Sequence, residues 1–115
     1  MATLTAKTKV KDETLEQIFN TVDTLKRDLT QGINFNQLNS DSFTVTSKNK
    51  KLTYVRKNNQ LKRNRKIIIR NVTDFYIAYF PESKSVLYRI EVNKREQVKG
   101  YIFMPDYEEN KNVWT

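Results

Sequence analysis

The stretch at residues 72–90, VTDFYIAYFPESKSVLYRI, is the best-patterned part of the chain. Residues 75–80 read as a strand, residues 81–84 as a tight turn, and residues 86–92 as the returning strand. Proline suits the start of the turn because its ring fixes φ and it has no N–H to donate. We therefore expect a hairpin whose larger apolar side chains fill a core or an interface: Ile77, Tyr79, Val86, Tyr88 and Ile90.

Outward from this hairpin, the chain reads as one helix followed by about five strands, an α+β order. The helix is predicted at residues 12–29, where apolar side chains recur at spacings of three and four: Leu15, Ile18, Phe19, Val22, Leu25 and Leu29. Gly32 is expected to act as the stop signal of the helix. Residues 33–38 are ambiguous and residues 58–64 read as a polar loop. Further strands are predicted at residues 42–46, 52–57, 66–70 and 101–104.

The composition limits the chemistry that the chain can perform. Its 115 residues suit one domain, with residues 1–11 as a flexible arm, residues 12–108 as the core and residues 109–115 as a tail. The absence of Cys and His, together with only two Gly, excludes zinc sites, disulfides, imidazole bases and a glycine-rich phosphate loop. A metal site would need carboxylates and carbonyls, which suit Mg²⁺ or Mn²⁺. No membrane span or signal peptide is visible, and the lack of Cys fits a cytoplasmic protein.

The positive charge is concentrated in one segment. Residues 50–70 hold nine Lys or Arg and no acid. Since the whole chain has a net charge of +8, this segment accounts for all of the positive excess. Such a segment is typical of phosphate-binding proteins and predicts a nucleic-acid partner, while a solvated basic hairpin face is the alternative. Tyr54 and Tyr76 could add stacking on bases. The residues predicted to contact nucleic acid are Lys50, Lys51, Arg56, Lys62, Arg63, Arg65, Lys66 and Arg70.

A second constellation joins the helix to the first predicted hairpin. Glu16 lies in the helix, Asp41 begins the first strand and Lys57 ends the second. If the two strands pair, Asp41 and Lys57 come close together, and an acid that holds Mg²⁺ beside a lysine suits phosphodiester hydrolysis. Each residue also has an ordinary reading: Asp41 as a turn residue, Lys57 as a surface charge and Glu16 as a first-turn helix acid.

The order of these residues resembles a known family. The segments DSFTVTSKNKKLTYVRKNNQLKRNRKIII at 41–69, TDFYIAYFPESKSVLYRIEV at 73–92 and QVKGYIFMPDYE at 97–108 resemble small PD-(D/E)XK nucleases. The resemblance is to the compact group that includes bacterial intron-encoded homing endonucleases. It implies a restriction-endonuclease-like core with a mixed sheet, Asp41 and Glu16 as ligands of Mg²⁺ or Mn²⁺, and Lys57 as the motif lysine. At the position two before Lys57, where the family has Glu or Gln, this chain has Val55.

Three functions remain open at this point. The first is a metal-dependent DNA endonuclease in which Asp41, Lys57 and Glu16 are catalytic. The second is a nucleic-acid-binding protein whose catalytic site is degenerate at Val55, with DNA or RNA as its partner. The third is a protein-interaction factor of a phage or another mobile element. The resemblance also implies a homo-oligomer.

Overall fold

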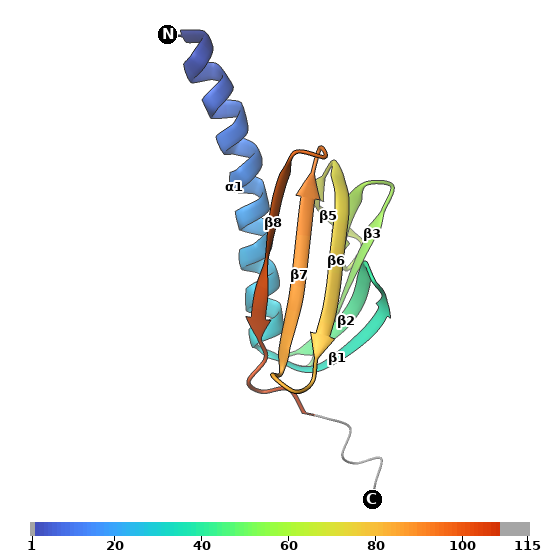
Figure 1. Cartoon of the computed structure of the whole chain (residues 1–115). Coiled ribbons are helices and arrows are strands. Elements are labelled where there is room, and N and C mark those ends of the chain that lie inside the picture. The colour runs from blue at the N-terminus through green and yellow to red at the C-terminus, as the bar shows by residue number, and fades with distance from the viewer. Residues whose placement is uncertain (1, 109–115) are drawn as a thin grey trace, which may run out of the picture.

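The computed structural model describes the backbone of residues 2–108 and the side chains of residues 13–108. One long helix, α1 (Ala2–Thr30), precedes eight strands (Figure 1). The strands are β1 (Gly32–Asn39), β2 (Ser42–Ser47), β3 (Lys50–Lys57), β4 (Gln60–Arg63), β5 (Lys66–Arg70), β6 (Val72–Phe80), β7 (Ser85–Val92) and β8 (Glu96–Phe103). The predicted α+β class is therefore confirmed.

The strands form two antiparallel sheets in simple chain order. β1 to β5 make a five-stranded sheet and β6 to β8 a three-stranded sheet. Every pairing is antiparallel, so the expected mixed sheet of about five strands is wrong in both strand number and strand direction. The ambiguous residues 33–38 belong to β1, and the polar loop predicted at residues 58–64 instead contains β4.

Two-residue turns explain why more strands form than the sequence predicted. Lys48 and Asn49, Asn58 and Asn59, and Asn64 and Arg65 all have positive φ, as tight hairpin turns of type I′ require. Asparagine tolerates this left-handed conformation better than most residues, so the chain can turn here without glycine. Asn64 also fixes its turn through its side chain, because its Oδ1 accepts a hydrogen bond of 2.8 Å from the Thr53 amide.

The helix covers the side that the two sheets leave open. Ile18, Val22, Leu25 and Leu29 are buried, as the spacing predicted, but Phe19 is 51% exposed and points away from the core. The helix begins at Ala2, so the backbone of the predicted arm is helical from residue 2 onward, and the flexibility of that arm stays a prediction. The predicted tail, residues 109–115, lies outside the described residues.

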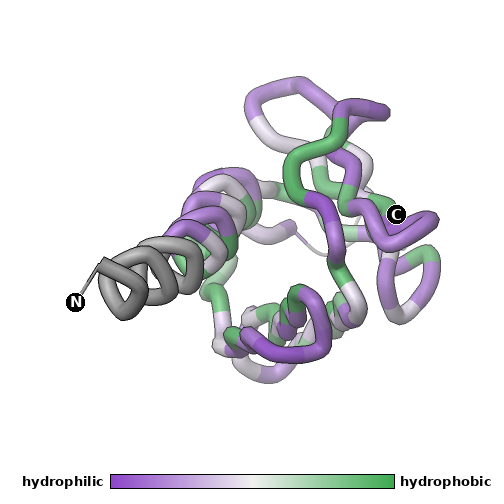
Figure 2. The backbone as a smooth tube through the Cα atoms, turned by 90° about the horizontal axis from the view of Figure 1, so that it is seen from above, coloured by the Kyte–Doolittle hydropathy of each residue, from purple (hydrophilic) through white to green (hydrophobic). Residues whose placement is uncertain are grey.

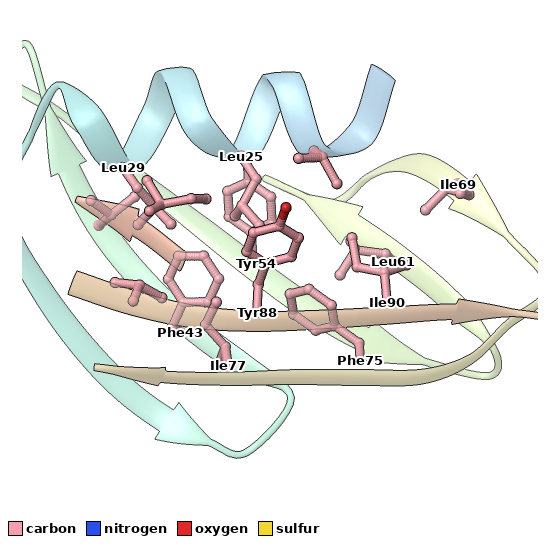
Figure 3. Close-up of a cluster of buried hydrophobic side chains, with 14 of the residues drawn as sticks. Leu25, Leu29, Phe43, Tyr54, Leu61, Ile69, Phe75, Ile77, Tyr88 and Ile90 are labelled. Atoms are coloured by element: carbon pink, nitrogen blue, oxygen red, sulfur yellow. The ribbon is translucent and has the colours of Figure 1, made fainter. Parts of the chain in front are cut away.

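One continuous core lies between the helix and the sheets (Figures 2 and 3). The hairpin of β6 and β7 supplies Ile77, Val86, Tyr88 and Ile90 to it, and Tyr79 packs against it half-buried, so the prediction for this hairpin is confirmed. The sheets are also joined by backbone groups. The Ile77 amide donates to the Ser40 carbonyl at 2.8 Å, and Gln37 Nε2 donates to the Ile77 carbonyl at 2.9 Å.

Gly32 follows the helix as predicted, but for a different reason. Its φ is not positive, so it is no left-handed cap. A Cβ at this position would lie 2.5 Å from Val45 Cγ2 and 3.0 Å from Met104 Cε. Glycine is therefore needed here because the chain enters β1 in close contact with the core.

A buried acid ties the helix to the five-stranded sheet. Asp28, near the end of α1, is only 3% exposed. Arg63 of β4 binds it with two hydrogen bonds, Nε to Oδ2 at 2.7 Å and Nη2 to Oδ1 at 3.1 Å. The hydroxyl of Tyr54 on β3 donates to the same Oδ2. Burial, and then the hydrogen bond to Asp28, raise the pKa of Tyr54 well above its usual range.

We expect loss of Arg63 to destabilise the fold more than loss of another arginine. Arg63→Ala leaves the buried Asp28 carboxylate without its two guanidinium hydrogen bonds, and the other cation, Arg27, is mostly exposed and 3.7 Å from Asp28 Oδ1. The free energy of unfolding should fall by about 3 kcal/mol. Arg70→Ala removes an exposed arginine at the end of β5 and should cost less than about 0.5 kcal/mol. Urea denaturation measures both. Equal unfolding midpoints for the two variants would contradict a stabilising role for the pair.

The raised pKa of Tyr54 predicts alkaline sensitivity. Its folded pKa is raised, so its contribution to stability is complete below the unfolded tyrosine pKa of about 10 and is lost as the pH rises beyond it. Between roughly pH 9 and pH 11, the range around the ordinary tyrosine pKa, the melting temperature of the wild type should fall more steeply than that of Tyr54→Phe. All other residues are the same in both proteins, so an equal fall of the two melting temperatures with pH would contradict the assignment.

Candidate nucleic-acid interface

The outward side of the five-stranded sheet gathers the basic residues. Alternation along β3 turns Leu52 and Tyr54 into the core and Lys51, Thr53, Val55 and Lys57 outward. The strand register places Lys62 of β4 beside Val55, and Arg70 of β5 beside Gln60, which is itself opposite Lys57. We call this surface the cationic face, and its charged residues are Lys51, Lys57, Lys62, Arg65 and Arg70.

No acid offsets these charges within the sheet. Asp41 is the only acid between Asp28 and Asp74, and it lies in the turn between β1 and β2 rather than in a strand. Within the described part of the chain, none of the five cations of the face forms an ion pair. The cationic face therefore presents uncompensated positive charge to solvent.

A shallow groove crosses the middle of this face. Its lining consists of Thr53, Val55, Lys62, Asn64 and Arg65. The two cations can neutralise phosphates, while the hydroxyl and the amide can hydrogen-bond to phosphate or sugar oxygens. Val55, the residue that departs from the family pattern, provides an apolar patch in this groove.

Two of the predicted nucleic-acid contacts are occupied inside the protein instead. The guanidinium group of Arg63 binds Asp28, as described above. That of Arg56 donates to the carbonyls of Val72 at 3.1 Å and Thr73 at 3.2 Å, and it lies 3.7 Å from Asp41 Oδ2. Arg63 therefore links β4 to α1, and Arg56 links β3 to the start of β6. Lys50 and Lys66 are exposed at strand ends, but alternation and register put them on the same side as Tyr54 and Arg63. The remaining predicted contacts lie on the cationic face.

The three predicted catalytic residues lie on different elements of the fold. Glu16 is exposed on α1, which packs against the inner side of the sheets. Asp41 lies beside Arg56, whose amide donates to its carbonyl at 3.2 Å. Lys57 is exposed, and alternation turns it to the opposite side of β3 from Arg56. The five-stranded sheet therefore lies between Glu16 and Lys57, and the catalytic roles of all three stay predictions.

Metal ligands do not gather elsewhere in the described part of the chain. Among residues that the structure describes, no three acidic side chains are close enough together to hold a metal ion. α1, the helix of the described chain, is not apolar enough to cross a membrane.

One aromatic side chain lies elsewhere than the sequence predicted, and two exposed aromatic side chains were not predicted. Tyr54, expected to stack on bases, is fully buried against Phe43 with ring centroids 4.8 Å apart. Tyr101 and Phe103 of β8 are 67% and 58% exposed. The sequence signal for these two exposed rings was their alternation with Ile102, because the two neighbours of a buried residue in a strand face outward.

Comparison with known proteins adds no relative. No family model, no curated protein and no solved structure matches this chain.

Proposed function

We propose that this protein binds the phosphate backbone of nucleic acids through its cationic face. The observation that supports this proposal is a five-stranded sheet with no acid in any strand and with Lys51, Lys57, Lys62, Arg65 and Arg70 on its outward side. The strands hold these cations at fixed separations, so little chain entropy is lost when a phosphate backbone binds across them.

The binding should depend steeply on salt. Each phosphate that a cation neutralises releases condensed counterions, and five such contacts on duplex DNA would give a slope of about −4.5 in a plot of log affinity against log salt concentration. Contacts to the phosphate backbone carry no sequence information of their own. We therefore propose binding with little sequence preference.

Hydrolysis by a restriction-endonuclease-like site is a separate proposal, and it depends on the order of residues along the chain. Asp41 is the residue that supports it, because the turn that carries Asp41 lies beside the end of β3 that carries Lys57. Two observations favour binding over cleavage: Asp41 pairs with Arg56, and the side chain of Val55 offers no oxygen to a metal ion. We propose that the protein binds nucleic acid without cutting it.

Removing two cations of the groove should weaken DNA binding. In Lys62→Ala/Arg65→Ala, we expect the affinity for a labelled DNA duplex of mixed sequence to fall about tenfold or more at low salt. The salt slope should fall in magnitude by about 2, because two phosphate contacts are lost. Fluorescence anisotropy at several salt concentrations measures both quantities.

The matched control removes the same charge from the other sheet. Lys84→Ala/Lys94→Ala changes two exposed lysines in the turns that flank β7. If this control weakened binding as much as the groove variant, net charge rather than the cationic face would explain the affinity.

A plasmid-nicking assay separates binding from cleavage. Supercoiled plasmid incubated with the wild type in Mg²⁺ or Mn²⁺ should be nicked no faster than plasmid incubated with Asp41→Ala. Gel electrophoresis of the plasmid measures the nicked fraction. Nicking by the wild type that Asp41→Ala loses would establish the endonuclease and overturn our preference.

A further inference from the structure

The outward side of the three-stranded sheet carries exposed aromatic rings. Register places Phe80, Ser85 and Phe103 in one row across the sheet, and Ala78, Leu87 and Tyr101 in the next. Phe80 is 43% exposed, Tyr101 67% and Phe103 58%. We call this surface the aromatic face. It belongs to a different sheet from the cationic face, and each of the two faces points away from the shared core.

The rings are arranged along a strand rather than packed into a closed cluster. Tyr101 and Phe103 are two residues apart on β8, which places their Cα atoms about 7 Å apart on one side of the strand. The ring of Phe80 reaches across from β6, with its centroid 6.4 Å from that of Tyr101 and an angle of 52° between the planes. At least two ring surfaces therefore stand open to solvent at a regular interval.

Cations continue the same line. Lys99 precedes Tyr101 by two residues and faces the same side, and it forms no ion pair within the described residues. Arg89 of β7 lies opposite Lys99, with its guanidinium carbon 5.0 Å from the centroid of the Tyr76 ring. A groove between Leu87, Arg89, Lys99 and Tyr101 joins the cations to the rings.

Two acids of the strands lie on this face, in the row that is two away from Tyr101. Asp74 pairs with Arg89, and Glu91 accepts a hydrogen bond of 2.9 Å from the Thr73 hydroxyl but forms no ion pair within the described residues. Lys99 lies in the row next to Tyr101 and also forms no ion pair within the described residues, so the charge nearest the exposed rings is positive. An occupant with aromatic groups and negative charge in alternation would complement this pattern, whereas an apolar protein surface would leave Lys99 unpaired.

We propose that the aromatic face binds unpaired bases of a single-stranded nucleic acid. Tyr101 and Phe103 would stack on successive bases, and Lys99 would contact the phosphate that precedes them. Stacking on aromatic side chains and cationic contacts to the backbone are together the usual means of binding single strands without sequence preference. The cationic face has no exposed ring among its residues, so the two faces would take different forms of nucleic acid.

This inference rests on the proposed function only for the class of ligand, because the two surfaces share no residue. The test uses the variant Tyr101→Thr/Phe103→Thr, which removes both rings and keeps residues that favour strands. We expect its affinity for a labelled thymidine oligonucleotide to fall about tenfold or more, and its affinity for a DNA duplex to stay that of the wild type. Phe19→Ala is the matched control, since it removes an exposed ring from α1 and should change neither affinity.

The other possible results distinguish failure of this inference from failure of the proposed function. Wild-type affinity of the ring variant for the oligonucleotide would overturn the inference, and would leave duplex binding by the cationic face untouched. Absence of salt-dependent duplex binding by the wild type would instead overturn the proposed function. If sedimentation showed a wild-type dimer that the ring variant converts to a monomer without a change in oligonucleotide affinity, the aromatic face would be a protein interface and the inference would fail.

Discussion

The buried carboxylate of Asp28 is the constraint on which the arrangement of the surface depends. It holds Tyr54 on β3 and Arg63 on β4, two residues that are direct partners in the strand register. Because side chains alternate along a strand, fixing these two toward the helix forces their neighbours Thr53 and Lys62 outward. A slip of one residue would bury lysines and expose the core. One buried acid thus determines which side of the sheet carries the cationic face.

The turns decide how much sheet the sequence can make. In the five-stranded sheet, three of them place two consecutive residues at positive φ, and asparagine occupies at least one position in each. Since these turns need no additional loop residues, β3, β4 and β5 follow one another with two residues between strands. The short connections keep the basic segment in regular strands, where its charges are held in rows. A flexible loop of the same composition would present no fixed surface.

The sequence predicts the helix stripe and the hairpin of β6 and β7 because both depend on local periodicity, which a linear pattern records. The other strands were harder to predict. A pair of polar residues such as Asn58 and Asn59 reads equally well as part of a loop, and only pairing with a neighbouring strand decides between the two. The roles of Arg56 and Arg63 were also invisible, since a basic residue that faces inward is recognised only when its partner acid, here Asp41 or Asp28, is placed beside it. The position of Tyr54 follows from the same buried acid.

The distribution of acids along the chain supports the proposal that a polyanion binds the cationic face. Between Thr30 and Thr73 the chain has one acid, Asp41, and that acid pairs with an arginine of the inner side, as Asp28 does. Like charges held on one face repel one another and lower the stability of the folded state. Acids in place of the half-buried Thr46 of β2 or Thr53 of β3 would reduce this repulsion without replacing a fully buried residue. Binding of a polyanion would relieve this repulsion, which supports the proposal of a negatively charged partner.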